Sequence, residues 1–408
     1  MESFCHICKG RGMCGKPCRI LASLKNFQPK VGLEFSGSAP EIFVGRSNYP
    51  AVYTGILSPN EYGSTEKLSM PEIWFQEKAT IDDIIQFRSQ MIYSRFRSNI
   101  KTGSRFLATM QEIAMASKPV ATEFKLRKKP DVNFSLDLHM PFVGNPAPLE
   151  RVRLEENARV EKKVDYLVND SDIKATEAVH ELYESDIAVS NIIKVLAAGL
   201  LGLKTQRKLV PSRWAITAVD DSISKMLLEK IKTFSLISEF LLFNAEYLGN
   251  HYEIILLPSQ FEFEVIEAKM PGSVWNPQTG NTSFSQDYET FYGRKNYAGE
   301  VTGAYYANRL AAAEYLSRIG KQASCIVMRE ARQEYYMPCG VGILREASRD
   351  AFARLPEKFS SIKEALQEAG KRMRNPVQEF AGRSIMLKNF KSQKRLSEFL
   401  QQKELQKY

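Results

Sequence analysis

The sequence lacks the features that mark secreted, membrane-spanning and repeat proteins. Its longest apolar stretch, Ile192–Leu203, contains Lys194 and is too short to cross a bilayer. The first residues are rich in cysteine, glycine and lysine, so they do not predict a secretory signal. We find no internal repeat and no low-complexity segment in the sequence. We therefore expect an intracellular, cytoplasmic protein that has no membrane partner.

Histidine is scarce, and cysteine is concentrated in one place. The chain has 4 histidines in 408 residues, and only His251 lies near the segments that carry candidate sites, so we assign no catalytic role to histidine. Of the 6 cysteines, Cys325 and Cys339 lie in apolar segments and are expected to be buried thiols. The other cysteines lie together near the N-terminus.

Positive charge is concentrated at the two ends of the chain. The net charge is +9, of which residues 1–30 carry +5 and residues 371–408 carry +7, leaving −3 for residues 31–370. Basic ends on a weakly acidic body indicate anionic partners at the termini, although ordinary solvated tails would have the same composition. The length and the apolar fraction are typical of a soluble globular protein with two or three domains.

Four cysteines at the N-terminus have the spacing C-x2-C-x5-C-x3-C: Cys5, Cys8, Cys14 and Cys18. Two thiolate pairs joined by a glycine-rich turn can close a tetrahedron around zinc. Disulfides are the alternative, but a reducing cytosol disfavours them, and His6 could replace one cysteine as a ligand. We predict a structural zinc module over residues 1–22 with no catalytic role, because four protein ligands leave no open position on the metal.

Helix and strand patterns are mixed without strict alternation. Apolar periodicity predicts helices over residues 81–98, 106–117, 171–185, 187–200 and 299–319. Extended patterns predict strands near 43–44, 120–126, 132–138, 158–168, 252–257, 261–268, 323–329 and 335–345, with 252–257 and 261–268 forming a hairpin. This mixture favours an α+β fold, in which a large irregular core lies between the small zinc module and a flexible C-terminal tail.

Residues 208–222, with the sequence KLVPSRWAITAVDDS, form the central stretch of the chain. The short apolar run that begins after Pro211 predicts a buried strand, followed by a helix over 223–234. Arg213 opens the run and Asp220 and Asp221 close it, and charges at the rim of a buried segment need partners. Either Asp220 caps the helix and Arg213 pairs with a core carboxylate, or these residues line a polar cleft.

Arginine recurs beside glycine and tyrosine along the chain, as in Gly45-Arg46 and Gly293-Arg294. A guanidinium next to glycine can approach a phosphate closely and make two hydrogen bonds to it. We therefore predict a nucleotide or DNA-phosphate cleft, with pairing of each arginine to a core acid, Arg329 included, as the alternative. The candidate cleft residues are Arg46, Arg213, Asp220, Asp221, Arg294 and Arg345.

A weaker pattern points to an enzyme. Glu267-Ala-Lys269 resembles the E-x-K of metal-dependent nucleases, in which carboxylates hold Mg²⁺ and the lysine orients water. The distant acid would be Asp220 or Asp221. The alternative function is therefore an enzyme acting on nucleic acid or a nucleotide, either a nuclease or a nucleotide-using transferase, with Arg213 and the two aspartates in its cleft.

The end of the chain has the pattern Q-x-x-Φ-x-x-Φ-Φ, formed by Gln393, Leu396, Phe399 and Leu400. It resembles the PCNA-interacting (PIP) box by which replication and repair proteins dock on the sliding clamp. One short helical turn would present the three apolar side chains together. Many examples have an aromatic residue where Leu400 stands, and a plain amphipathic helix is the alternative. We predict that residues 391–408 form a tail that binds the clamp.

The zinc-type N-terminus, the segment VPSRWAITAVDD and the terminal clamp box occur together in the archaeal Nre family of DNA-repair proteins, which this chain resembles over nearly its whole length. VGRSNYP, FYGRKNYA and MPCGVGILREA also look like motifs of that family. By this resemblance, residues 23–280 correspond to the family's N-terminal block and residues 285–390 to its C-terminal block. The resemblance implies a chromosome-associated role in the DNA-damage response, with PCNA and DNA as partners, and it implies no reaction.

Overall fold

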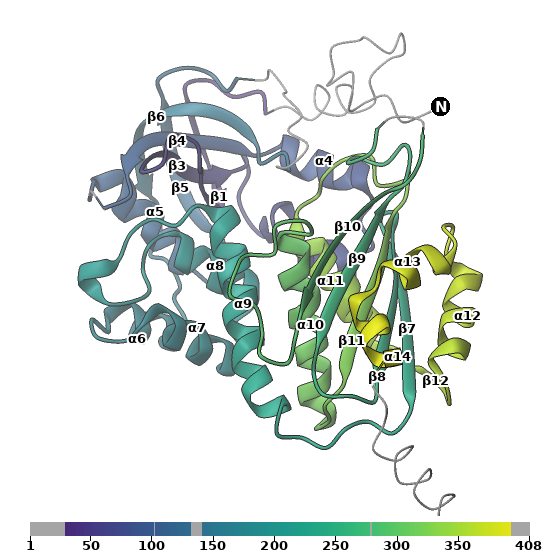
Figure 1. Cartoon of the computed structure of the whole chain (residues 1–408). Coiled ribbons are helices and arrows are strands. Elements are labelled where there is room, and N and C mark those ends of the chain that lie inside the picture. Colours follow the sequence, from purple (N-terminus) through teal and green to yellow (C-terminus); the bar gives the residue numbers. More distant parts are fainter. Residues whose placement is uncertain (1–28, 102, 132–140, 278–279, 393–408) are drawn as a thin grey trace, which may run out of the picture.

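The computed structural model describes residues 29–101, 103–131, 141–277 and 280–392. It confirms the α+β class, because two six-stranded sheets are combined with helices that lie between them and around them (Figure 1). Within these residues, no helix has both the length and the apolar character that a membrane span requires.

The first sheet has the strand order β1-β5-β6-β4-β3-β2, and only β4 and β6 pair in parallel. Pro40 alone separates the two edge strands β1 and β2, so the sheet curls until its edges meet. Burial alternates along β5, as expected for a strand with one face in the core. The strands are β1 (Glu34–Ala39), β2 (Glu41–Val44), β3 (Ala51–Ser58), β4 (Ile92–Asn99), β5 (Val120–Leu126) and β6 (Asn145–Leu154).

Short helices cover the first sheet and complete its core. Helix α5 begins where the hydroxyl of Ser104 accepts a hydrogen bond from the backbone N–H of Leu107, which satisfies one free donor of the first turn. Apolar residues of α8 pack into the same core as the strands. The helices of this core are α5 (Arg105–Met115), α6 (Lys162–Asn169), α7 (Ala175–Glu184) and α8 (Val189–Ala197). Helices α3 (Pro71–Gln76) and α4 (Ile81–Ser89) pack into the core beside the second sheet, and the short 3-10 turns are η1 (Glu66–Leu68) and η2 (Lys204–Gln206).

The second sheet has the strand order β10-β9-β11-β8-β7-β12. Helices α10 and α11 cover one face, and α12, α13 and α14 cover the other (Figure 1). The strands are β7 (Phe240–Tyr247), β8 (Asn250–Leu257), β9 (Phe263–Lys269), β10 (Ser283–Glu289), β11 (Ser324–Ala331) and β12 (Glu357–Phe359). The three outer helices are α12 (Ile362–Arg372), α13 (Val377–Arg383) and α14 (Ile385–Ser392).

The predicted hairpin of residues 252–257 and 261–268 is wrong. Both segments are strands, but β11 lies between them, antiparallel to β8 and parallel to β9. Every residue of β11 is buried, so the position between two apolar strands suits it better than an edge. The predicted division between residues 280 and 285 falls between β9 and β10, which pair with each other, so the two sequence blocks share one sheet.

Four other segments differ from the predictions. The central stretch is not a strand, because helix α9 runs from Ser212 to Ile231. Its buried residues Ala215, Val219 and Ile223 are spaced four apart, which places them on one face of a helix. Residues 335–345 contain the start of helix α11 instead of a strand, and residues 158–168 contain the start of α6. The predicted helix over 81–98 ends at Ser89, and the rest is β4.

Helices α9, α10 (Gly303–Ile319) and α11 (Val341–Ala353) run parallel to one another between the sheets (Figure 1). Near their N-terminal ends, Gly303 lies against Thr217 and Val341, and a Cβ atom at Gly303 would come within 2.8 Å of Val341 Cγ2. Further along, Asn308 Oδ1 accepts a hydrogen bond from the hydroxyl of Ser348 at 2.6 Å. Glycine at the start of α10 therefore permits the close packing of these three helices.

Arg309 is a charged residue in the middle of the buried helix α10. Its side chain is 2% exposed and donates to Glu289 of β10 at 2.8 Å, to Asp221 of α9, and to Ser224 Oγ at 3.1 Å. Because a buried cation is costly without partners, these contacts fix α10 against both α9 and the second sheet.

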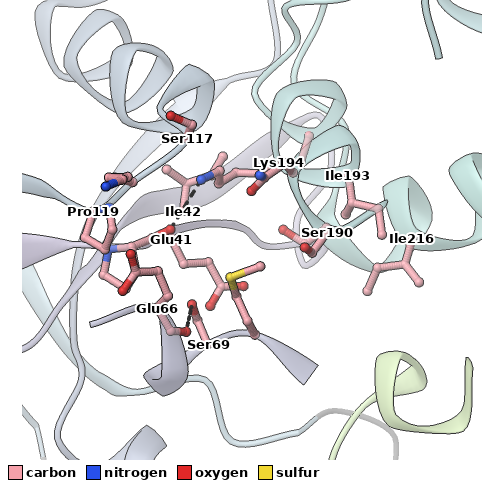
Figure 2. Close-up of a pocket in the computed structure, with 16 residues that line it drawn as sticks. Glu41, Ile42, Glu66, Ser69, Ser117, Pro119, Ser190, Ile193, Lys194 and Ile216 are labelled. Carbon is pink, nitrogen blue, oxygen red and sulfur yellow. Dashed lines mark hydrogen bonds between the residues drawn. The ribbon is translucent and has the colours of Figure 1, made fainter. Parts of the chain in front are cut away.

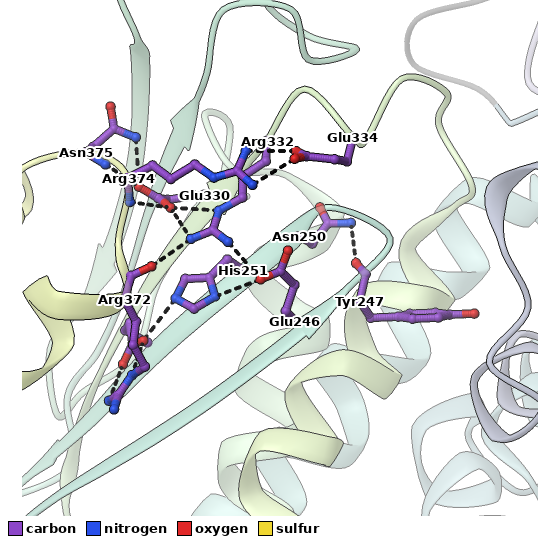
Figure 3. A network of polar contacts seen from close by, with 11 residues as sticks. Glu246, Tyr247, Asn250, His251, Glu330, Arg332, Glu334, Arg372, Arg374 and Asn375 are labelled. Atoms are coloured by element: carbon purple, nitrogen blue, oxygen red, sulfur yellow. Dashed lines mark hydrogen bonds and ion pairs between the residues drawn. The ribbon is translucent and has the colours of Figure 1, made fainter.

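A second network fixes the C-terminal helices to the same sheet (Figure 3). Glu330 of β11 accepts hydrogen bonds from the backbone N–H groups of Arg374 and Asn375, at 3.1 and 2.7 Å, and from the side chain of Arg332 at 2.9 Å. Burial acts to raise the pKa of Glu330, but the hydrogen bonds from Asn375 and Arg374 outweigh it and lower that pKa. The carboxylate therefore holds the turn between α12 and α13 in place.

The pairing of Arg309 predicts a large stability effect. In the variant Arg309→Leu, Glu289 keeps a buried charge without its cation, and we expect the free energy of unfolding to fall by about 3–5 kcal/mol. Arg354→Ala is the matched control, because Arg354 is 51% exposed and, among the described residues, its one ion pair is with Asp350. That change is expected to cost less than about 1 kcal/mol. Urea unfolding of both variants tests the difference, and equal losses would contradict it.

Candidate nucleic-acid interface

Three segments that are far apart in sequence meet at the N-terminal end of α9. The backbone N–H of Val44 donates to the hydroxyl of Ser212 at 3.0 Å. The N–H of Ile100 donates to the carbonyl of Pro50 at 3.1 Å, and the N–H of Leu209 donates to the carbonyl of Ile100 at 2.9 Å. These bonds place residues 45–50, 97–101 and 207–214 side by side.

The three segments contain basic residues and no aspartate or glutamate. Arg46, Arg97, Lys101 and Lys208 are exposed, and Arg213 is partly exposed. None of these five residues forms an ion pair with any residue that the structure describes. Their charges are therefore available to an anionic ligand.

Exposed aromatic rings lie among these cations. Trp214 and Tyr49 are 45% and 39% exposed, and their ring centroids lie 5.1 Å apart at an interplanar angle of 55°. Tyr53 is 43% exposed, and the guanidinium of Arg95 lies 4.7 Å from its ring centroid. We define the basic-aromatic face as Arg46, Tyr49, Tyr53, Arg97, Lys101, Lys208, Arg213 and Trp214.

Helix α9 adds to the positive potential of this face. Arg213 and Trp214 belong to the first turn of this 20-residue helix, where backbone N–H groups have no partner within the helix. The N-terminal end of a helix carries a partial positive charge that favours phosphate and other anions. Helices α10 and α11 are parallel to α9, so their N-terminal ends face the same direction as that of α9.

The structure does not bring all the predicted cleft residues together. Asp220 and Arg345 are buried and pair with each other at 2.7 Å, so they join α9 to α11 in the core and do not line a cleft with Arg213. Asp221 pairs with Arg309 and, at 2.8 Å, with Lys225. The expectation that Asp220 caps a helix is also wrong, because it lies inside α9.

Arg294 has a local structural role. It pairs with Asp287 at 2.9 Å and donates to the carbonyl of Tyr288 at 2.8 Å, which holds the loop that follows β10. Of the candidate arginines, only Arg46 and Arg213 lie in the segments that meet at the start of α9. The same segments also contain Lys101, Lys208 and Trp214, which the sequence alone had not indicated as site residues.

The E-x-K residues do not share a site with the aspartates of α9. Glu267 pairs with Arg329, and Lys269 Nζ donates to Ser285 Oγ at 2.7 Å. In the described part of the chain, no group of three or more His, Cys, Asp or Glu side chains is placed to hold a metal ion. The Mg²⁺ site of the alternative function therefore has no donor set among these residues.

The two isolated cysteines are buried thiols, as predicted. Cys325 lies in β11 and Cys339 precedes α11, and burial raises the pKa of both thiols. The predicted zinc and clamp sites fall outside the described residues: Cys5, Cys8, Cys14, Cys18, Gln393, Leu396, Phe399 and Leu400.

A pocket lies beside the basic-aromatic face (Figure 2). Ser212 and Ile216 of α9 contribute to its wall, and Lys194 of α8 lies opposite the corner between β1 and β2. Burial lowers the pKa of Lys194 to about 8, although Glu41 and Glu66 act in the opposite direction. One signal of this residue is visible in the sequence, where it is a single lysine within an otherwise apolar stretch.

Exposed aromatic rings among unpaired cations are typical of surfaces that bind nucleic acids. The sequence comparisons define the family. Residues 13–276 match the family described as "Archaeal Nre, N-terminal", and residues 289–399 match "Archaeal Nre, C-terminal". The chain therefore belongs to the archaeal Nre family.

Similar proteins cover most of the chain. A protein of Archaeoglobus fulgidus named DNA repair protein NreB is 36% identical over 97% of this chain and 100% of its own length. DNA repair protein NreA of Haloferax volcanii is 39% identical over 78% of each chain. DNA repair protein NreA of Archaeoglobus fulgidus is 34% identical over 91% of this chain and 94% of its own. No solved structure matches the chain at a significant level.

Proposed function

We propose that this chain acts in DNA repair and binds DNA through the basic-aromatic face. The names of its relatives support the process. The observation that carries the DNA contact is the meeting of three acid-free segments at the start of α9, which hold Trp214, Tyr49 and cations that form no ion pair with a described residue. Arginine and lysine side chains would contact the phosphates, and the rings would stack on unpaired bases.

This composition favours single-stranded or distorted DNA over a regular duplex. A base that is stacked inside a duplex has no free face for an aromatic side chain, whereas an unpaired base has one. Trp214 and Tyr49 already contact each other, so their rings lose little conformational freedom when a base binds. The phosphate contacts would make the affinity fall as the salt concentration rises.

The finer part of the proposal is recruitment to the sliding clamp PCNA through residues 391–408. Support comes from the sequence pattern of the clamp box, formed by Gln393, Leu396, Phe399 and Leu400. In the described part of the chain before the box, Met386 and Leu387 of α14 are buried against the second sheet. A structural zinc module at the N-terminus completes the proposed organisation.

The basic-aromatic face predicts a loss of DNA affinity without a loss of stability. Trp214→Ala should weaken binding of a single-stranded oligonucleotide by about 1–3 kcal/mol, because one stacking ring is removed. The melting temperature should change little, since Trp214 is 45% exposed. Arg213→Ala should also reduce the salt dependence of binding by about one phosphate contact. Fluorescence anisotropy over a range of salt concentrations measures both effects.

Tyr62→Ala is the matched control for this test. Tyr62 is 60% exposed, but its hydroxyl donates to Glu155 at 2.7 Å, so it lies beside an acid and outside the face. Its replacement should leave DNA affinity unchanged. A reduced melting temperature of Trp214→Ala with unchanged affinity would show that the face is structural.

The clamp box predicts a tail that binds PCNA without help from the folded core. A peptide of residues 388–407 should bind the clamp with roughly micromolar affinity, because ordering a short segment offsets much of the contact energy. Phe399→Ala should cost about 2 kcal/mol or more, and Lys403→Ala almost nothing. Calorimetry with PCNA tests this, and equal binding by the parent and Phe399→Ala chains would exclude this docking mode.

The cysteine spacing predicts about one zinc ion per chain, bound by four thiolates. Replacing Cys8 and Cys18 by serine should release the metal while the described core keeps its melting temperature, because the energy of metal binding acts on the segment that carries the ligands. Elemental analysis of protein purified without chelator measures the zinc content. Parent protein that contains no zinc would contradict the proposed zinc module.

A further inference from the structure

The pocket around Lys194 has the polar lining of a ligand site (Figure 2). It has a volume of about 90 Å³ and is partly open to solvent, so it can admit a small polar group such as an aldehyde. Its walls come from the β1–β2 corner, η1, the connection between α5 and β5, and helices α8 and α9. The polar side chains in the wall include Glu41, Glu66, Lys118, Ser190 and Lys194.

The Lys194 amine is held at a defined position. Its Nζ atom donates to the carbonyl of Ala116 at 3.1 Å and to the carbonyl of Pro40 at 3.4 Å. A neutral amine has two N–H groups and one lone pair, so the two carbonyls use both donors and leave the lone pair free. Burial lowers the pKa of Lys194 to about 8, which makes the neutral form accessible near neutral pH.

The surroundings of the amine indicate a missing partner. Glu41 is engaged by Arg88 at 2.6 Å, and Glu66 forms no ion pair with a described residue. The hydroxyl oxygen of Ser190, one helical turn before Lys194, is buried and has no hydrogen-bond partner among the described residues. A buried hydroxyl without a partner is rare, and a ligand that carries hydroxyl or carbonyl groups would satisfy it.

One turn of α9 contributes to both the pocket and the basic-aromatic face. Ser212 and Ile216 line the pocket, and Arg213 and Trp214, between them in sequence, belong to the face. The pocket and the face therefore meet at the first turn of α9. A nucleotide that has lost its base is the easiest to turn out of the strand, because it has no stacking or pairing to break.

We propose that Lys194 forms an imine with the aldehyde carbon of an abasic site in DNA held on the basic-aromatic face. This inference rests on the proposed function. In the ring-opened sugar, C1′ is an aldehyde carbon. The Lys194 nitrogen donates its lone pair to C1′, the π electrons of the C=O bond move to oxygen, and a proton passes from nitrogen to that oxygen. Loss of water from the resulting carbinolamine gives the C=N bond, so one water is released and no oxidant is needed.

Trapping of the imine tests the proposal. The full-length chain is incubated with an oligonucleotide that contains one abasic site, in the presence of cyanoborohydride, and the adduct is mapped by mass spectrometry of peptides. We expect one DNA chain attached to Lys194. Lys194→Arg should reduce the adduct at least about tenfold, because a guanidinium stays protonated. Lys230→Arg is the control, since Lys230 is 67% exposed and lies outside the pocket, and it should retain the adduct.

The pH dependence separates a reacting amine from a structural one. The trapping rate should rise as the pH passes through about 8, where the Lys194 amine loses its proton. Glu41, Glu66, Arg88 and Lys118 are the charged groups around it, and the two glutamates favour its protonated form. An adduct that maps to another lysine, or a flat pH profile, would overturn the proposal.

Separate measurements distinguish failure of this inference from failure of the proposed function. Anisotropy reports DNA binding without chemistry, and deoxyribose 5-phosphate is a small aldehyde probe that needs no DNA contact. If abasic DNA binds but neither aldehyde is trapped, the imine is excluded and the DNA-binding face stands. If DNA does not bind, the proposed function fails, and abasic DNA is excluded as the substrate with it.

Discussion

A guanidinium buried in the middle of α10 is the constraint on which the arrangement of the molecule depends. Arg309 must have anionic partners, and it finds them on two different elements, Asp221 on α9 and Glu289 on β10. These contacts fix the axial position of α10 against a neighbouring helix and against the second sheet at once. The Arg345–Asp220 pair does the same for α11 and α9. Charges in the core thus set the register that apolar packing alone would leave adjustable.

That register sets the position of the N-terminal end of α9 in the molecule. The basic-aromatic face and the pocket around Lys194 both lie at this end of the helix. Its first turn joins the loop after β2 to the loop after β4 and exposes Arg213 and Trp214. The opposite side of the same turn closes the pocket around Lys194. A binding surface and a pocket are therefore positioned by one rigid element, which favours precise placement of a bound strand.

The sequence predicted the α+β class, several elements and the two buried thiols, because these depend on local pattern and composition. It did not distinguish strand from helix in the central stretch, since a short apolar run suits both until its partners are known. The hairpin was wrong because β11, distant in sequence, separates β8 from β9. The basic-aromatic face was only partly predictable. Its acid-free segments are visible in the sequence, but they are brought together by backbone hydrogen bonds from Val44, Ile100 and Leu209 to residues that are far away in sequence. Arg345 and Asp220 were predicted as cleft residues, but they pair with each other in the core, as in the alternative of arginines paired with core acids.

The strand order of the two sheets has a consequence for synthesis of the chain. All strands of the first sheet lie before residue 155, so that sheet is complete while the ribosome is still translating the rest. In the second sheet, β8 and β9 emerge together but must wait for β11, and until then each has an unpaired, apolar edge. The growing chain is therefore most exposed to aggregation between residues 257 and 324. The proposed clamp tail follows β12 in the chain, so a chain that can be recruited is one whose second sheet already has all its strands.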